Sequence, residues 1–134
     1  MTYLAGFVVF GFAIWLLGLT LLILLRPASA RDFLRAFASS PKAHYLEQSL
    51  RLLGGIAFVL YAGQMVFPRL FTGFGWLLVT TAVILLVLPW RWHHRFGQWC
   101  IPILLRHLTP FALGALFLGL FILYCQLGPL FALL

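Results

Sequence analysis

Histidines and one glutamate are the side chains of this sequence that could bind a metal or a redox cofactor. His44 and Glu47 lie three residues apart and share one face of a helix. His93, His94 and His107 come from a second polar segment. Imidazole and carboxylate groups suit iron, zinc or manganese, so these five residues are the candidates for a cofactor-binding cluster. The alternative is that the histidines are polar anchors at a membrane surface. We favour that alternative and assign no metal ligands, because only one carboxylate is in position to help.

Bis-histidine haem is a second interpretation of the same cluster. It requires two axial ligands from facing helices at one depth. His44 could pair with His93, His94 or His107. No histidine lies inside an apolar stretch, so such a haem would lie at the membrane surface. The spacing selects no particular cofactor.

Arginines and tryptophans in the same segments form a third candidate site. The arginines are Arg51, Arg91, Arg95 and Arg106. The neighbouring tryptophans are Trp90, Trp92 and Trp99. Guanidinium groups suit phosphate geometry, and tryptophans favour the membrane interface. We therefore expect a site for an anionic lipid headgroup or a quinone, with general attraction to the lipid leaflet as the simpler alternative.

The elements that position these side chains must be membrane helices. Of the 134 residues, 64% are hydrophobic and 8% are charged, and the mean hydropathy is +1.10. Too few polar side chains exist to cover a water-soluble domain, and disordered chains are poor in apolar residues. The net charge of +7 would suggest nucleic acid in a soluble protein. Here it is better explained by attraction to anionic lipids, so membrane lipids are the expected partners and nucleic acid is not.

Four stretches are long enough to cross a bilayer, because about 20 helical residues span its hydrocarbon core. They are residues 3–25, 50–67, 74–90 and 109–130. Ser40 and Pro41 form a helix start, so the second helix begins at Pro41 and its first turns are polar. The predicted fold is an all-α bundle of four transmembrane helices forming a single membrane domain.

Both basic connections are predicted to contain short interfacial helices on the cytoplasmic side. In the first, Arg31 and Arg35 lie four residues apart on one side of a helix. The opposite side is apolar, with Phe33, Leu34 and Phe37. Such a helix places apolar side chains in the acyl boundary and arginines among phosphates. The second connection, residues 96–108, has the same character.

The distribution of positive charge predicts the orientation. Eight of the nine Lys and Arg residues lie in residues 26–51 and 91–107, and Arg69 is the exception. Cytoplasmic loops carry such an excess, so both termini are expected on the outer, periplasmic side of an inner (cytoplasmic) membrane. Eight arginines against one lysine indicate a bacterial source.

Small residues at helical spacing predict the faces on which the helices pack, because close packing drives helix association in lipid. They are Gly11 and Gly18 in the first helix, Gly54 and Gly55 in the second, and Ala115 and Gly119 in the fourth. Gln64 and Gln126 are the amides nearest the hydrocarbon, and each is expected to find a partner on another helix.

The segment Arg51-Leu-Leu-Gly-Gly-Ile-Ala-Phe-Val-Leu-Tyr-Ala-Gly63 resembles the opening helix of the small four-helix DoxX-like membrane proteins. The resemblance covers this one helix, which is the second span here and the first in that family. No function is carried over from it.

The sequence offers no catalytic constellation. Its serines lack a histidine–carboxylate partner at a readable spacing, no Gly-rich phosphate loop is present, and no ionisable residue is predicted in mid-membrane. The leading hypothesis is therefore a small non-enzymatic membrane protein. It would act as an accessory or assembly subunit of a larger membrane complex, or as a homo-oligomer, through its helix faces and basic surface.

Two other functions are weighed against this hypothesis. One is a membrane redox or lipid-modifying component that uses His44, Glu47 and His93 or His94 with a metal, haem or quinone. The other is an oligomeric carrier for a small solute, built around Gln64, Tyr61 and Gln126.

Overall fold

A computed structural model describes residues 1–36 and 39–134, which form helices joined by short turns without any strand. In chain order the helices are α1 (Thr2–Leu25), α2 (Pro27–Ala36), α3 (Pro41–Tyr61), the short 3-10 helix η1 (Ala62–Gln64), α4 (Pro68–Val87), α5 (Trp90–Arg106) and α6 (Leu108–Phe131). The predicted all-α class is confirmed for these residues. Phe37, part of the first predicted interfacial helix, lies outside the described residues.

Within the described residues, three helices, α1, α4 and α6, are long and apolar enough to cross a membrane. This is the pattern of a multi-pass membrane protein. Helix α3 has 21 residues, but its first half carries Lys42, Glu47 and Arg51. It begins as predicted, with the Ser40 side chain accepting the Ala43 N–H at 3.1 Å.

The expected span over residues 50–67 is divided in the structure. Its first part is the apolar end of α3, which stops at Tyr61. The chain then forms η1 and turns before Pro68, which starts α4. Gln64 lies in η1 and is exposed. The turn is tight, and Phe67 adopts a left-handed backbone conformation with φ 62°, which is strained for a bulky residue.

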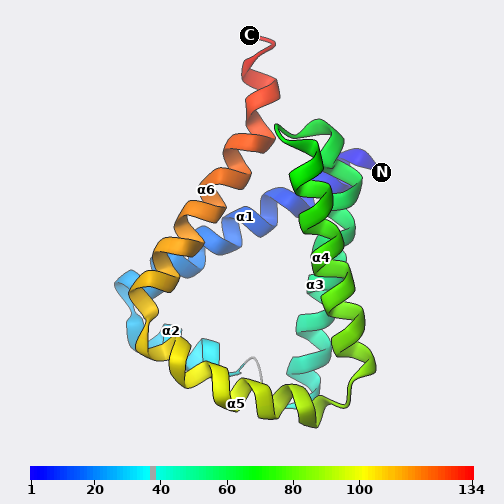
Figure 1. The fold of residues 1–134 in the computed structure, drawn as a ribbon. Helices are drawn as coiled ribbons and strands as arrows, with labels where there is room; N and C mark the ends of the chain where they lie inside the picture. Colours follow the sequence, from blue (N-terminus) through cyan, green and yellow to red (C-terminus); the bar gives the residue numbers. More distant parts are fainter. Residues whose placement is uncertain (37–38) are drawn as a thin grey trace.

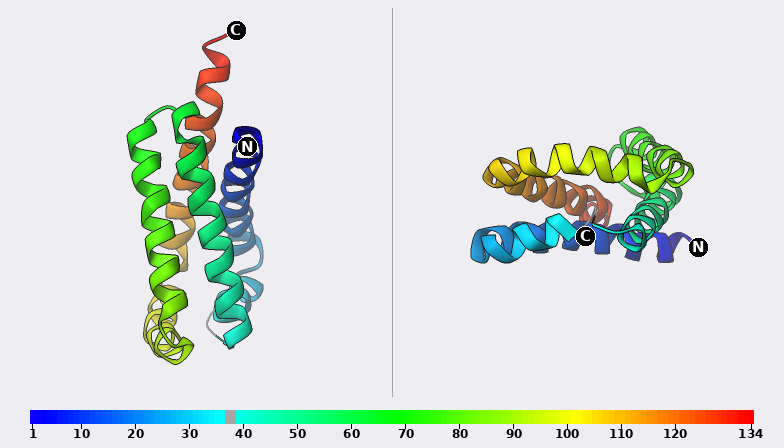
Figure 2. Two further views of the ribbon diagram at one scale, coloured as in Figure 1. Left: turned by 90° about the vertical axis from the view of Figure 1, so that its right-hand side faces the viewer. Right: turned by 90° about the horizontal axis from the view of Figure 1, so that it is seen from below.

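The four long helices pack in the order α6, α1, α3, α4. Figure 1 shows the α1–α6 pair and the α3–α4 pair close together near the two termini and well separated at the other end. Helices α2 and α5 lie across that other end, at a large angle to the long helices (Figure 2). The predicted bundle of four transmembrane helices is therefore not confirmed. The row is open between α4 and α6.

Glycines allow two of the close helix contacts. A Cβ on Gly55 of α3 would meet the Gly75 carbonyl oxygen of α4 at 2.9 Å, and one on Gly75 would meet the Gly55 carbonyl oxygen at 2.7 Å. A Cβ on Gly119 of α6 would lie 3.2 Å from the Ala13 carbonyl oxygen of α1. Backbones approach this closely only where no side chain intervenes.

The other small residues predicted to pack occupy different surroundings. Ala115 is buried in the larger apolar cluster, and Gly54 is in ordinary contact with the Phe12 ring. A Cβ on Gly11 or Gly18 would meet no atom of the described chain within 4 Å. The structure therefore places these two glycines of α1 away from its helix contacts, on the exposed side.

The contact that joins α4 to α6 lies near the termini. The Val66 N–H donates to the Cys125 carbonyl oxygen at 2.9 Å. That carbonyl lacks its usual helical donor, because the residue four positions later is Pro129, which has no N–H. Phe71 stacks on Phe121 with ring centroids 5.8 Å apart. These contacts fix one end of the α4–α6 pair.

At the opposite end, α2 packs beneath α1 and α6 and is tied to α5. The Arg31 guanidinium donates to the Leu105 carbonyl oxygen at 2.9 Å. A second apolar cluster lies around this contact, and its buried members are Leu19, Ile23, Ala30, Leu34, Leu105, Leu108 and Ala112. Both short helices thus have one apolar side packed on the long helices, as interfacial helices do.

Candidate functional site

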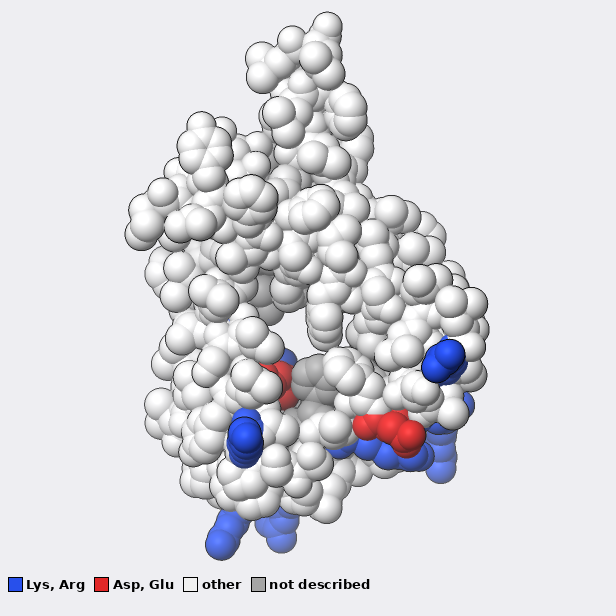
Figure 3. Space-filling view, turned by 180° about the vertical axis from the view of Figure 1, so that it is seen from behind, with Lys and Arg blue, Asp and Glu red and all other residues white. Residues whose placement is uncertain are grey.

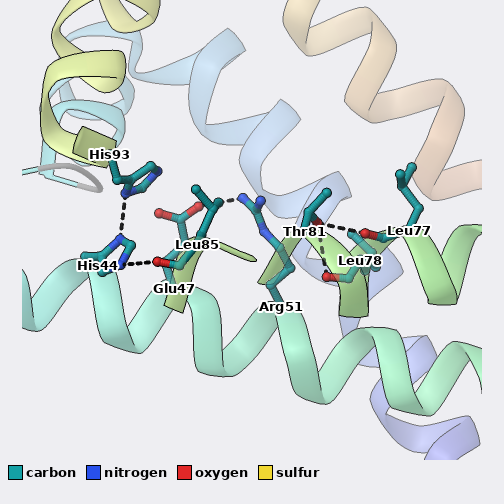
Figure 4. A network of polar contacts seen from close by, with 8 residues as sticks. All are labelled: His44, Glu47, Arg51, Leu77, Leu78, Thr81, Leu85 and His93. Carbon is teal, nitrogen blue, oxygen red and sulfur yellow. Dashed lines mark hydrogen bonds and ion pairs between the residues drawn. The ribbon is translucent and has the colours of Figure 1, made fainter. Parts of the chain in front are cut away.

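Four of the polar side chains singled out by the sequence meet where α3, α4 and α5 come together, namely His44, Glu47, Arg51 and His93 (Figure 4). His44 of α3 is almost fully buried. Its Nε2 lies 3.0 Å from the Leu85 carbonyl oxygen of α4, and its Nδ1 lies 2.6 Å from His93 Nδ1 of α5. One imidazole thus links three helices.

The Leu85 carbonyl has no helical donor, and His44 supplies one. The Leu85 carbonyl lies four residues before Pro89, which has no N–H to donate to it. A carbonyl only accepts, so His44 Nε2 carries the proton and donates. If Nε2 carries the only ring proton of His44, its Nδ1 accepts from His93 Nδ1, which carries the proton of the second ring. Each ring has a defined tautomer as a result.

Glu47 and Arg51 form an ion pair beside the two histidines. The Arg51 guanidinium donates to Glu47 Oε1 at 2.7 Å, and the Glu47 side chain is only 16% exposed. The spacing of four residues on α3 favours this pair. Burial lowers the pKa of His93, and the negative charge of Glu47 offsets only part of that effect. His93 is therefore held in its neutral form more strongly than a solvent-exposed histidine.

Gln48 is a buried polar residue that the sequence interpretation missed. It lies one turn after His44 on the same side of α3 and is 0% exposed. Neither its Nε2 nor its Oε1 has a hydrogen-bond partner among the described residues. The signal was present in the spacing, because residues four apart share a helix face. An unpaired buried amide is unfavourable by about 1–3 kcal/mol.

The five residues predicted as a cofactor cluster are brought together only in part. His44, Glu47 and His93 lie near one another, as Figure 4 shows. His94 contacts Gln98 on the same helix at 3.1 Å. His107 lies at the far end of α5, where its Nδ1 is 2.9 Å from the Ile103 carbonyl oxygen.

Metal or haem binding by this cluster would compete with contacts already made. Both ring nitrogens of His44 are occupied. A ligand bond to either nitrogen would break a link between two helices. In the part of the chain that the structure describes, no three His, Cys, Asp or Glu side chains are grouped to hold a metal ion.

The four arginines predicted to bind lipid headgroups also separate. Arg91 and Arg95 line one open surface hollow of about 400 Å³, together with Trp92 and His94. Arg51 is held by Glu47, and Arg106 lies at the other end of α5. Two of the four arginines are thus adjacent.

Positive charge gathers at the end of the molecule where α2 and α5 lie. Figure 3 shows Lys and Arg side chains projecting from this end, while the visible surface near the termini carries none. The same view shows a hollow between the helix pairs, with acidic and basic side chains at its edge. The hollow lies between the parts of the long helices that diverge.

Three further hydrogen bonds join distant parts of the chain. The Thr20 hydroxyl of α1 lies 3.1 Å from the Ala112 carbonyl oxygen of α6. The Gln126 amide donates to the Gly6 carbonyl oxygen at 2.8 Å. Arg31 reaches α5 as described above. The helix-to-helix partner expected for Gln126 is thus present.

No protein-family model, curated protein or solved structure matches this chain.

Proposed function

We propose that the chain is a small, non-enzymatic, multi-pass membrane protein that acts as an accessory or assembly subunit of a larger membrane complex. In this proposal α3 is a fourth membrane-spanning helix, with its charged first turns in the interface. The open side between α4 and α6 receives a transmembrane helix of the partner, or of a second copy of the chain.

The open row of helices is the observation that carries this proposal. Near the termini α6 is joined to the turn before α4 by the Val66–Cys125 hydrogen bond and to α4 itself by the Phe71–Phe121 ring contact. Towards the other end the two helices diverge (Figure 1). A helix inserted there would complete the packing that the row leaves unfinished.

The polar cluster supports a binding role over a catalytic one. Both His44 nitrogens are engaged, and Glu47 is paired with Arg51. These contacts link helices, and within the described residues no hydrogen bond joins a hydroxyl or thiol to His44 or His93, as nucleophilic catalysis would need. The redox and carrier alternatives have no comparable observation in their favour.

A photo-crosslinking residue in α6 tests the proposal. Leu118 lies three residues before Phe121 and so shares the face turned towards α4. Leu120 lies on a different face and is exposed, which makes it the matched control. The full chain carrying either substitution is irradiated in its native membrane, purified in mild detergent and examined for discrete crosslinked products. Two differently tagged copies identify a self-crosslink.

We expect a discrete product from position 118 and none from position 120. A product with another protein supports the accessory role, and a product between the two tagged copies supports the homo-oligomeric form. Equal products from both positions, or none from 118, would overturn the proposed use of the open side. A partner-free protein with measurable turnover would overturn the non-enzymatic assignment.

A further inference from the structure

Helix α5 has three distinct faces. One is buried against the rest of the chain and includes Gly97 and Leu105. A second is an exposed aromatic and aliphatic row at helical spacing, consisting of Trp92, Phe96, Trp99 and Ile103. The third carries Arg91, Arg95 and Arg106. An apolar row beside a basic row is typical of a helix lying in a membrane surface.

The exposure of the aromatic row is large. Trp92 is 70% exposed and Trp99 is 68% exposed. Tryptophans favour the level of the lipid headgroups. Since α5 lies across the long helices (Figure 1), this row can run along the membrane surface while the long helices cross it.

Contacts at both ends hold α5 in place. Near its beginning His93 is bonded to His44 of α3 at 2.6 Å. Near its end the Leu105 carbonyl oxygen accepts from Arg31 of α2 at 2.9 Å. The arginine row is therefore presented on a fixed helix, which reduces the entropic cost of binding.

We propose that the first turns of α5 bind the phosphate group of an anionic membrane lipid between Arg91 and Arg95. These arginines are four residues apart and line the surface hollow with Trp92 and His94. Residues 90–106 contain no Asp or Glu, so α5 itself supplies no competing carboxylate. Two guanidinium groups can each donate two parallel hydrogen bonds to phosphate oxygens.

Trp92 favours a lipid over a free phosphate ion as the ligand of the hollow. It lies between the two arginines in sequence and belongs to the exposed aromatic row. A lipid bound here would place its phosphate at the arginines and the upper part of its acyl chains along the row. A free phosphate ion would use the arginines alone.

Native mass spectrometry of the full chain in detergent tests this site with phosphatidylglycerol and phosphatidylcholine as probes. The site variant is Arg91→Gln/Arg95→Gln. The matched control is Arg26→Gln/Arg35→Gln, which removes the same charge from exposed positions outside α5 at the same end. Charge-assisted hydrogen bonds to phosphate are stronger than those between neutral groups. We therefore expect roughly tenfold or greater weakening of phosphatidylglycerol binding in the site variant and less than about twofold in the control.

Each other outcome has a defined meaning. Equal weakening in both double variants would overturn the site and leave general charge attraction. Equal binding of phosphatidylcholine to the unaltered chain would overturn the preference for an anionic lipid. In a further outcome, inorganic phosphate displaces phosphatidylglycerol and binds a Trp92→Ala variant as strongly as it binds the unaltered chain. That result would assign the hollow to free phosphate.

A charge-preserving variant distinguishes loss of the binding site from misfolding of the chain. Arg91→Lys/Arg95→Lys keeps the net charge and removes the planar fork. We expect it to elute and melt as the unaltered chain does and to bind phosphatidylglycerol with intermediate strength. Full binding by this variant would contradict a two-arginine phosphate site.

Discussion

Two prolines determine where this chain needs hydrogen-bond donors from elsewhere. Pro89 leaves the Leu85 carbonyl without a helical donor, and Pro129 does the same to the Cys125 carbonyl. His44 donates to the first at 3.0 Å, and the Val66 N–H donates to the second at 2.9 Å. The backbone of α4 therefore accounts for the buried His44 without any ligand.

The pair His44–His93 should make stability depend on pH. The pKa of His93 is lowered in the folded protein from its ordinary 6.5, chiefly by burial. The unfolded chain therefore binds more protons below that value, so stability is full above about pH 6.5 and is lost as pH falls towards the folded pKa. We expect the melting temperature in detergent to fall between pH 7.5 and 5.

His93→Asn is the variant that isolates this effect. The asparagine amide can donate to His44 Nδ1 but does not titrate. We expect its melting temperature to fall less over the same pH range than that of the unaltered chain. Parallel pH curves for the two proteins would show that His93 does not account for the dependence.

The sequence indicated only some of the residues that lie together at this site, and not how they bond. Helical spacing placed Glu47 and Arg51 one turn apart, and they do form an ion pair. The need of the Leu85 carbonyl for a donor follows from Pro89. That His44 meets this need depends on how α3 is aligned along α4, which no local spacing specifies.

Helix contacts differ in how far residue spacing predicts them. Gly55 and Gly119 were singled out by small-residue spacing and lie at close backbone contacts. Gly75, the partner of Gly55, was missed because its own helix has no second glycine at the same spacing on that face. Gly11 and Gly18 satisfy the spacing rule yet face open space, since spacing alone does not distinguish a contact face from a lipid-facing one.

Gly55→Ala tests the close contact between helices α3 and α4. The added Cβ would meet the Gly75 carbonyl oxygen at 2.9 Å, so the helices must move apart. We expect destabilisation of about 1–3 kcal/mol, as for other overpacked positions. Thermal or denaturant unfolding in detergent measures it.

Gly11→Ala is the matched control for that variant. It introduces the same methyl group into a helix where no described atom lies within 4 Å. Alanine is the better helix former by about 0.5–1 kcal/mol, so the change should be neutral or slightly stabilising. Similar losses from both substitutions would mean that the close α3–α4 contact is not what Gly55 provides.

For the molecule as a whole, charge and topology agree. The N- and C-terminal ends lie at the same end of the long helices (Figure 1). Eight of the nine Lys and Arg residues lie towards the other end, seven of them in α2, the first half of α3 and α5, and Arg26 just before α2. Hydropathy predicted the membrane class and charge counting predicted this separation. The open row was not predictable, because it depends on angles between helices that apolar spans do not encode.

Labelling of single cysteines tests the orientation of the whole chain. Cys100 and Cys125 are free thiols. They are first replaced by serine and alanine, respectively. Ser29→Cys then reports on α2, and Ala132→Cys reports on the C-terminal end. Both positions are exposed.

Because positively charged segments stay on the cytoplasmic side, we expect an impermeant maleimide to label position 132 in intact cells. Position 29 should be labelled only after the membrane is opened. Labelling of position 29 in intact cells, with protection of position 132, would reverse the orientation, and equal labelling of both would mean that the chain does not separate its two ends across a membrane.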